Sequence, residues 1–480
     1  MKLTRRDFVA GSAAMAAAFP RGAFAAALPR EAETVVIGAG AAGIAAARRI
    51  AALGRSVIVL EASDRVGGRC QTDATTFDVP FDRGARWLYN TDTSPVAKLA
   101  RGAEVDLYPA TRGQRIRIGR RNARAGETED FLALLVRANR AIGEAVRGKP
   151  DMPAASAMPK DLREWAGTAD FVLGAANTGR DLQNLSAFDL VMMAQRDNAV
   201  TCRQGLGTLI SKLSVSLTVA LSTPVTRISW SGKDAQVETP SGTLKASAVI
   251  VTASTNALLS GKLKFSPELP KRQQDAASKL SLGSYDHIAV ELPGNPLGLA
   301  KDDVVIEQST DNRTGLLLAN LGGSSLCQVD IAGSFGADMS SRGEAAMTAF
   351  AVEWLNKLFG ADVAGAVKRT HATRWNDVPY VLGAMSAASA GGQPMHRVLM
   401  EPVGCMFFAG DAVHETLAGT VNGAWESGER AADAAMRRLG VLKALPTDAP
   451  AKGPRGKAKR ETLSSAPVPE QRGLAWPSRN

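Results

Sequence analysis

Three glycines near the beginning of the chain have the spacing of a phosphate-binding turn. Gly38, Gly40 and Gly43 follow a short β-type run at residues 34–37, and an alanine-rich helical stretch follows them. Gly38 permits a tight turn, Gly40 lets the backbone approach a pyrophosphate, and Gly43 lets the helix pack closely on the strand. Glu61 ends the next apolar run, 23 residues after Gly38, where a carboxylate can accept a hydrogen bond from a ribose hydroxyl. The series predicts a βαβ unit that binds a dinucleotide, with the phosphates at the N-terminus of the helix.

The segment that follows indicates which dinucleotide is bound. "EASDRVGGRC" places Arg65, Gly68 and Arg69 directly after the ribose-binding acid. A guanidinium can pair with a pyrophosphate in a forked geometry. The segment resembles the flavin amine oxidase family, in which the adjacent glycines let the chain pass under FAD and the arginine contacts its phosphates.

The resemblance extends in the family's order over about residues 33–440. "FDRGARWLY" resembles the segment whose backbone lies near the flavin ring, and "LSTPVTRISWSG" resembles the strand in which Val225 would clasp the adenine. In "GCMFFAGDAVHETLAGTVNGAWESGERAADAAMRRL", a buried strand would end at Gly410 and Asp411. A helix would begin near Asn422, with its free N–H groups pointing at the flavin pyrimidine. The resemblance implies these cofactor-binding residues: Gly38, Gly40, Ala42, Gly43, Glu61, Ala62, Arg65, Gly68, Arg69, Arg86, Trp87, Val225, Gly410, Asp411, Thr420 and Val421.

The chain departs from the family at the positions that face the amine. The two positions of the family's aromatic cage fall at Met385 and Thr420, so a cation–π attraction of about 1 kcal/mol is lost. Ala384 stands where some members carry a flavin-bonding cysteine, so the FAD is expected to be non-covalent. His287 stands where the family often has a lysine near flavin N5.

Several residues are candidates for contact with the substrate. In the strand at residues 285–292, His287 lies on the opposite face from Ile288. If that face is the cavity wall, the imidazole could hold a water or take a proton; the alternative is a histidine paired within the protein or facing solvent. His414 would lie beside the flavin ring, and Trp375 and Tyr380 could line the cavity or belong to the core. The candidates are therefore His287, His414, Tyr380, Trp375, Met385 and Thr420.

The predicted fold is α/β, with a Rossmann-type doubly wound FAD-binding domain and an interleaved α+β substrate-binding domain. We expect the FAD-binding domain to comprise residues 31–100, 205–262 and 395–440. The substrate-binding domain would comprise residues 101–204 and 263–394, helical first and then with strands.

The leading function is the oxidation of an amine by hydride transfer to flavin N5, followed by hydrolysis of the imine. Electrons would pass to O2 or to a periplasmic redox protein. A first alternative is an amino-acid oxidase, with Arg203 or Arg374 as the cation for a carboxylate, or a desaturase-like enzyme acting on a C–C bond. A second alternative is a non-catalytic flavin-binding partner protein.

The two ends of the chain have their own composition. "LTRRDFVAGSAAMAAAFPRGAFA" places a twin arginine before an apolar run too short to span a bilayer, which resembles a twin-arginine export signal over residues 1–27. The expected location is the bacterial periplasm or the exterior, reached through the Tat translocon, with no stable membrane anchor. Residues 441–480 predict a disordered basic tail.

Charge and cysteine usage exclude other classes of function. Much of the net charge of +10 comes from the two ends, so the body is close to neutral and does not indicate a nucleic-acid-binding domain. The 4 cysteines are scattered without a C-x-x-C pair, which predicts neither a metal site nor a disulfide framework.

Overall fold

The computed structural model describes residues 28–110, 113–193, 196, 198–360 and 362–443. The predicted signal peptide at residues 1–27, and residues 444–480 of the predicted tail, lie outside the described residues. Among the described helices, none combines the length and the apolar composition needed to cross a bilayer.

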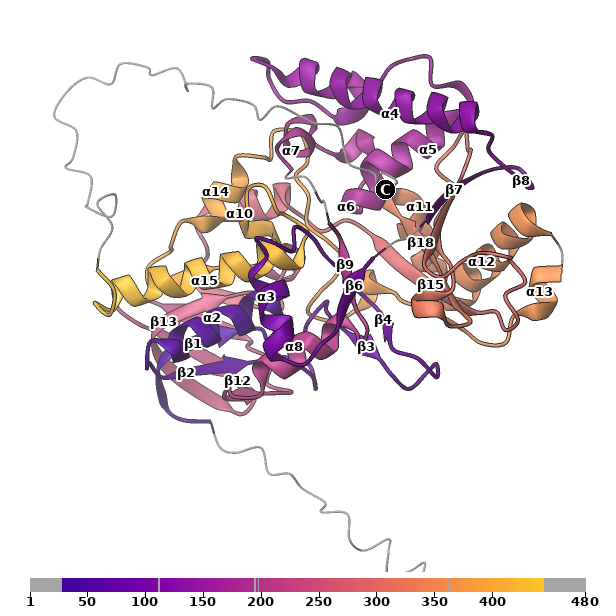
Figure 1. Cartoon of the computed structure of the whole chain (residues 1–480). Coiled ribbons are helices and arrows are strands. Elements are labelled where there is room, and N and C mark those ends of the chain that lie inside the picture. Colours follow the sequence, from indigo (N-terminus) through magenta and orange to yellow (C-terminus); the bar gives the residue numbers. More distant parts are fainter. Residues whose placement is uncertain (1–27, 111–112, 194–195, 197, 361, 444–480) are drawn as a thin grey trace, which may run out of the picture.

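Within the described residues, an eight-stranded sheet forms the first half of the molecule (Figure 1). The order is β10-β2-β1-β13-β12-β11-β14, and β20 also pairs with β13. Its strands are β1 (Glu31–Ile37), β2 (Val57–Leu60), β10 (Val219–Ala220), β11 (Arg227–Trp230), β12 (Ala235–Thr239), β13 (Gly242–Val251), β14 (Lys264–Ser266) and β20 (Met406–Phe408). β1 pairs in parallel with both β2 and β13, which confirms the predicted βαβ unit and brings the carboxyl ends of these strands to one edge.

Helices cover both faces of this sheet. They are α2 (Ala41–Ala52), α3 (Pro95–Gly102), α8 (Leu206–Ser214), α9 (Thr255–Leu259), α10 (Lys271–Lys279), α14 (Met395–Met400) and α15 (Val421–Arg438). Figure 1 shows α2 and α15 side by side over β1 and β13. Small residues allow this approach, because a Cβ at Gly428 would lie 2.1 Å from the carbonyl oxygen of Ala42. Two helices far apart in the sequence, α2 and α15, are thereby packed against each other.

A seven-stranded sheet of the described residues forms the second half, in the order β19-β15-β18-β17-β16-β7-β8. Its strands are β7 (Gly113–Ile118), β8 (Arg121–Asn122), β15 (Tyr285–Glu291), β16 (Asp303–Glu307), β17 (Leu316–Leu318), β18 (Leu326–Ala332) and β19 (Thr370–Ala372). Its helices are α4 (Ala125–Val146), α5 (Ala166–Asp170), α6 (Ala176–Thr178), α7 (Ala187–Met192), α11 (Gly333–Arg342), α12 (Glu344–Phe359) and α13 (Asp362–Ala366).

Strand β15 is buried on both faces, and its side chains separate as the alternation predicts. Ile288 and Val290 pack in one apolar cluster with side chains of α12. Tyr285 and Ala289 pack in another cluster, with side chains of α4. His287 lies on this second face, which also borders the cavity described below.

Two short sheets connect the halves: β3 (Thr72–Asp73) with β4 (Phe81–Asp82), and β5 (Trp87–Leu88) with β9 (Val200–Cys202) and β6 (Leu107–Pro109). One strand of the first sheet, β14, comes from the part of the chain expected in the substrate-binding domain. β14 runs parallel to β11 in the first sheet, beyond the expected boundary at residue 262.

Candidate functional site

A cavity of about 300 Å³ is lined by residues of both sheets and of the connections between them. It begins at the carboxyl end of β1 and reaches β15 and β18. Every expected cofactor-binding residue except Gly43 lines it. The lining members are Gly38, Gly40, Ala42, Glu61, Ala62, Arg65, Gly68, Arg69, Arg86, Trp87, Val225, Gly410, Asp411, Thr420 and Val421.

The glycine turn leaves the N-terminus of α2 open toward the cavity. Gly40 caps the helix without a side-chain hydrogen bond, and the first turn contains no acidic residue. Gly38 has φ +102°, and a Cβ at Gly43 would lie 1.9 Å from the carbonyl oxygen of Gly38. Gly43 therefore has the packing role that the motif predicts, although it does not line the cavity. The open N–H groups of this helix fit the pyrophosphate of the expected FAD.

The carboxylate of Glu61 fixes the shape of this turn. It accepts hydrogen bonds from the backbone N–H of Ala39 at 2.6 Å and from the backbone N–H of Ser63 at 2.8 Å. It lies at the cavity wall, where a ribose hydroxyl was expected. The structure therefore adds a positioning role for Glu61.

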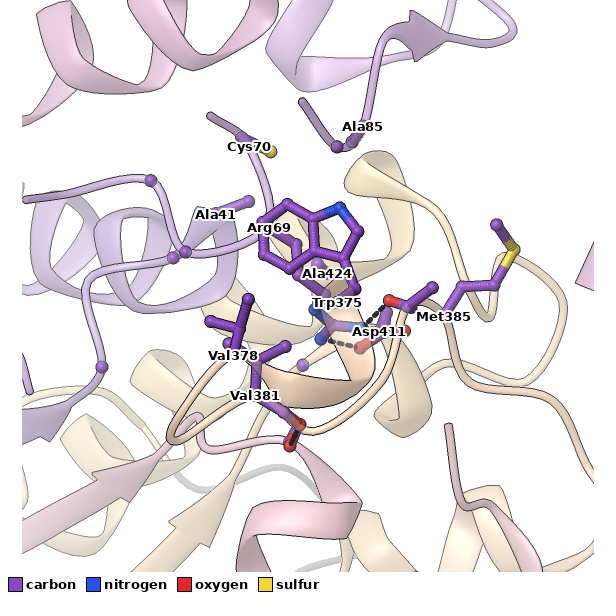
Figure 2. Close-up of a pocket in the computed structure, with 18 of the residues that line it drawn as sticks. Ala41, Arg69, Cys70, Ala85, Trp375, Val378, Val381, Met385, Asp411 and Ala424 are labelled. Atoms are coloured by element: carbon purple, nitrogen blue, oxygen red, sulfur yellow. Dashed lines mark hydrogen bonds and ion pairs between the residues drawn. The ribbon is translucent and has the colours of Figure 1, made fainter. Parts of the chain in front are cut away.

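Arg69 and Asp411 meet in the cavity wall and pair with each other (Figure 2). The guanidinium donates two hydrogen bonds to the carboxylate, at 2.6 and 3.0 Å, and a third to the carbonyl oxygen of Ala384 at 2.8 Å. Asp411 also accepts from the N–H and the hydroxyl of Ser386. Burial alone would raise the pKa of Asp411, but the charge and hydrogen bonds of Arg69 and the hydrogen bonds from Ser386 together lower it. The pair joins the N-terminal unit to the closing segment of the chain.

Arg65 lines the cavity and is hydrogen-bonded to the backbone of the loop that contains Gly68. Its guanidinium donates to the carbonyl oxygens of Val66 and Gly68 and so braces the glycine-containing loop. Burial lowers the pKa of Arg65. These hydrogen bonds hold Gly68 close to Gly40. The approach is tight, because a Cβ at Gly68 would lie 3.2 Å from the Cα of Gly40.

Other features of the wall also fit a bound FAD. A Cβ placed at Gly410 would meet no atom within 4 Å, so the cavity is open at that position. The Nε of Arg86 and the Nε1 of Trp87 are buried donors with no hydrogen-bond partner among the described residues. Ala384 carries no thiol, so no covalent bond to a cofactor can form there. These residues can hold the isoalloxazine ring without a covalent link.

His287 lies at the cavity wall in a buried hydrogen-bonded cluster. Its Nε2 lies 2.9 Å from the carbonyl oxygen of Gly84, and its Nδ1 lies 2.6 Å from Oδ1 of Asp330. Gln328 Nε2 and the Tyr285 hydroxyl also donate to Asp330, at 2.7 and 2.9 Å. Because a carbonyl oxygen only accepts, Nε2 of His287 carries a proton.

The cluster corrects the role expected for His287. Burial alone would lower the pKa of the imidazole, but the charge and hydrogen bond of Asp330 raise it above its usual value. Both ring nitrogens already have partners, so His287 offers no free nitrogen to a water or a substrate proton. It is a positioning residue that joins Asp330 to the Gly84 backbone.

The expectation for His414 is also wrong, because this side chain does not line the cavity. Its Nδ1 accepts from the N–H groups of Thr416 and Leu417, and its Nε2 lies 3.1 Å from the carboxylate of Glu426. The imidazole of His414 is therefore held by the turn that directly follows η7 (Asp411–Val413).

Trp375, Tyr380, Met385 and Thr420 all line the cavity, as expected. Figure 2 shows the Trp375 indole above the Arg69–Asp411 pair, with Met385 to one side. Trp375 Nε1 donates to the carbonyl oxygen of Arg83, whereas Tyr380 is 44% exposed and lies at the rim. The Thr420 hydroxyl accepts from the N–H of Gly423 and so caps α15.

The polar and aromatic wall residues that were not among the candidates include Tyr89, Arg196, Tyr285, Gln328 and Asp330. Gln328 and Asp330 alternate with apolar residues in "LCQVDIA", and such buried polar positions are a signal that sequence reasoning could have used. Arg203 and Arg374 do not line the cavity. Arg203 lies over the Tyr108 ring, and Arg374 pairs with Asp377.

Within the described ranges, no group of three His, Cys, Asp or Glu side chains is arranged to hold a metal ion. Cys70 lines the cavity, but burial raises its pKa to about 12, so it is a neutral thiol at physiological pH.

Comparison with known proteins gives a consistent assignment. A family model described as flavin-containing amine oxidoreductase matches residues 158–436, and a model of an NAD(P)-binding Rossmann-like domain matches residues 36–102. Polyamine oxidase 4 of Oryza sativa subsp. japonica is 26% identical, over 86% of this chain and 90% of its own length. Lysine-specific histone demethylase 2 of Homo sapiens is 25% identical over 83% of this chain. The chain spans about half the length of that demethylase.

Solved structures share the fold. Cyclohexylamine oxidase from Brevibacterium oxydans IH-35A superimposes with a TM-score of 0.72 at 20% identity, covering 85% of this chain and 100% of that chain. A putrescine oxidase mutant with redesigned cofactor binding gives a TM-score of 0.70 at 19% identity, covering 85% of this chain and 99% of that chain. With its Rossmann-like unit, its cavity suited to FAD and a family match over more than half its length, the chain belongs to the flavin-containing amine oxidoreductase family.

Proposed function

We propose that this protein is an FAD-dependent enzyme that oxidises a C–N bond of a small amine. The observation that carries the proposal is the continuity of one cavity. It joins the open N-terminus of α2 to a wall of aromatic and polar side chains on β15 and β18. FAD, when bound, supplies the oxidising group that accepts a hydride from the carbon next to the amine nitrogen.

The residues of the chain bind and orient the cofactor and the amine. Trp375, Tyr285 and Trp87 form aromatic parts of the wall and exclude bulk water from the reacting end. Thr420 caps α15, whose first turn contains no acidic residue and directs N–H groups toward the cavity. Such N–H groups stabilise negative charge that develops beside them.

Anaerobic mixing of the purified holoprotein with amines, polyamines and amino acids tests the proposal. At least one of them is expected to bleach the visible absorption of the flavin. Dithionite serves as the control that the flavin can be reduced. A flavin that dithionite bleaches but no member of the panel bleaches would contradict the proposal and favour a non-catalytic flavin-binding protein.

The electron acceptor belongs to the same proposal. O2 and a soluble redox protein are the two candidates. Stopped-flow reoxidation of the reduced enzyme by air-saturated buffer and by cytochrome c distinguishes an oxidase from a dehydrogenase.

We further propose that the protein is exported in folded form by the twin-arginine route. Arg5 and Arg6 precede an apolar run and a small-residue cleavage site, which supports export to the periplasm or the exterior. Replacement of both arginines by lysine should retain the protein in the cytoplasmic fraction of a bacterial host. Equal periplasmic amounts of wild type and variant would contradict the proposal.

A further inference from the structure

The cavity contains a guanidinium that no carboxylate of the described residues pairs with. Arg196 lines the cavity, and its Nη1 donates to the carbonyl oxygen of Asn177 at 2.8 Å. Its Nη2 lies 3.4 Å from the carbonyl oxygen of Ala418. Arg196 also donates a hydrogen bond to the Tyr89 hydroxyl. A guanidinium has five N–H donors, so Arg196 still has donors left for a ligand.

Tyr89 holds this guanidinium near the N-terminus of α15. The Cζ of Arg196 lies 5.6 Å from the centre of the Tyr89 ring. The backbone oxygen of Tyr89 accepts from Nδ2 of Asn422, in the first turn of α15, at 2.6 Å. Burial raises the pKa of Tyr89, while the Arg196 charge opposes the rise. Tyr89 is therefore a neutral aromatic platform for the guanidinium.

The same cavity contains an acceptor without a partner. Gln328 is 1% exposed, and its Oε1 has no hydrogen-bond partner among the described residues. Its Nε2 is directed at Asp330, because a carboxylate can only accept. The Oε1 of Gln328 is thus an acceptor whose hydrogen-bonding capacity the described residues leave unused.

We propose that Arg196 binds a carboxylate of the substrate and that Gln328 accepts from its amine, so that the substrate is an amino acid or another amine that carries a carboxylate. This inference rests on the proposed function. Guanidinium and carboxylate pair through two parallel hydrogen bonds. A polyamine would instead place a second positive charge in a cavity that already contains Arg196, and that repulsion is strong where water is excluded.

The test uses pairs of amines that differ only in the α-carboxylate: L-tyrosine with tyramine, and L-ornithine with putrescine. The measurement is the rate of anaerobic flavin reduction by the holoenzyme. In at least one pair, the carboxylate-bearing member is expected to react roughly 10- to 100-fold more efficiently, and R196Q should remove that preference. R196K should restore part of it. R203Q is the matched control, because Arg203 does not line the cavity, and it should keep the wild-type preference.

A second arm needs no turnover. Benzoate, titrated against the flavin spectrum, is expected to bind wild type at least about 10-fold more tightly than R196Q. If no amine reduces the flavin, the proposed function fails, and benzoate alone decides whether Arg196 is a carboxylate site. A preference for tyramine and putrescine that R196Q leaves unchanged would overturn the inference. So would an R196Q variant that loses FAD but keeps the substrate preference, since Arg196 would then hold the cofactor.

Discussion

Arg69 and Asp411, separated by 342 positions in the chain, form a two-bonded ion pair in the wall of the cofactor cavity. The side chain of Asp411 is 8% exposed, and that of Arg69 is 24% exposed. The pair therefore couples the loop that follows β2 to the segment between β20 and α15. Binding of FAD and global stability should both depend on it.

Asp411→Asn removes the charge while keeping the shape of the side chain. Loss of one partner from a buried pair costs about 3 kcal/mol or more, and partial exposure of Arg69 places this site at the lower end. We expect a lower free energy of unfolding in urea and weaker binding of FAD. Glu144→Gln is the control, because its pair with Arg140 is exposed and should contribute little. Equal losses in both variants would contradict the assigned role of Arg69 and Asp411.

Gly84→Ala should disrupt the site by crowding. A Cβ at Gly84 would lie 2.1 Å from the carbonyl oxygen of Arg69 and 2.8 Å from Cζ2 of Trp375. The overpacked side chain should lower stability by about 1–3 kcal/mol and reduce the FAD content of the purified protein. Gly126→Ala, in the first turn of α4, meets no atom within 4 Å and should be neutral or slightly stabilising. A Gly84→Ala protein with normal stability and normal FAD content would contradict the prediction, because the cavity wall would then have made room for the added methyl group.

Asp330→Asn should change the protonation of His287. In the wild type, the charge and hydrogen bond of Asp330, together with the Gly84 carbonyl and the Asp286 charge, raise the pKa of His287 against the effect of burial. The pKa of His287 should therefore be lower in the variant than in the wild type, and its titration should move to lower pH. The chain contains only 4 histidines, so NMR titration of labelled imidazoles can follow the change. An unchanged His287 titration would disprove the buried pair.

His396 should contribute stability that depends on pH. Its ring lies 3.0 Å from Oδ1 of Asp189; burial alone would lower its pKa, but Asp189 raises it. A raised folded-state pKa contributes stability that is fully present below the unfolded pKa of about 6.5 and is lost as pH rises through the folded pKa. The difference in unfolding free energy between wild type and His396→Gln should therefore shrink from pH 6 to pH 9.

His371→Gln provides the opposite case for the same measurement. Burial lowers the pKa of His371 in the folded protein, so protonation of this residue favours the unfolded state at low pH. The stability of the wild type relative to His371→Gln should therefore rise with pH, and this change should be complete by the unfolded pKa of about 6.5, so the scan for this variant extends below pH 6. Parallel pH profiles for His396→Gln and His371→Gln would contradict the two assignments.

Local patterns predicted the parts of the structure that local forces determine. The spacing of Gly38, Gly40 and Gly43 indicates a turn that only small residues can form, and the structure confirms the turn and the packing of α2. The alternation along β15 correctly separated His287 from Ile288, because successive side chains of a strand point to opposite faces.

The side chains that complete the site could not be predicted in this way. His414 follows the Gly410–Asp411 motif in the sequence, which suggested a position beside the flavin. The backbone N–H groups of Thr416 and Leu417 bind its ring instead, and this contact depends on the path of the backbone rather than on the motif. Arg196, Tyr89 and Gln328 come from three separate segments, and no spacing in the sequence brings them together. The pairing of Arg69 with Asp411 also depends on the long-range packing of α2 against α15.

The FAD content of the purified protein tests the central claim most directly. The account predicts a yellow protein that contains FAD in an equimolar amount and releases it, chemically unmodified, on denaturation. It also predicts that a bulky residue at position 40 abolishes this binding, because the backbone there must approach the pyrophosphate. A folded wild-type protein that is colourless and does not bind added FAD would contradict the account.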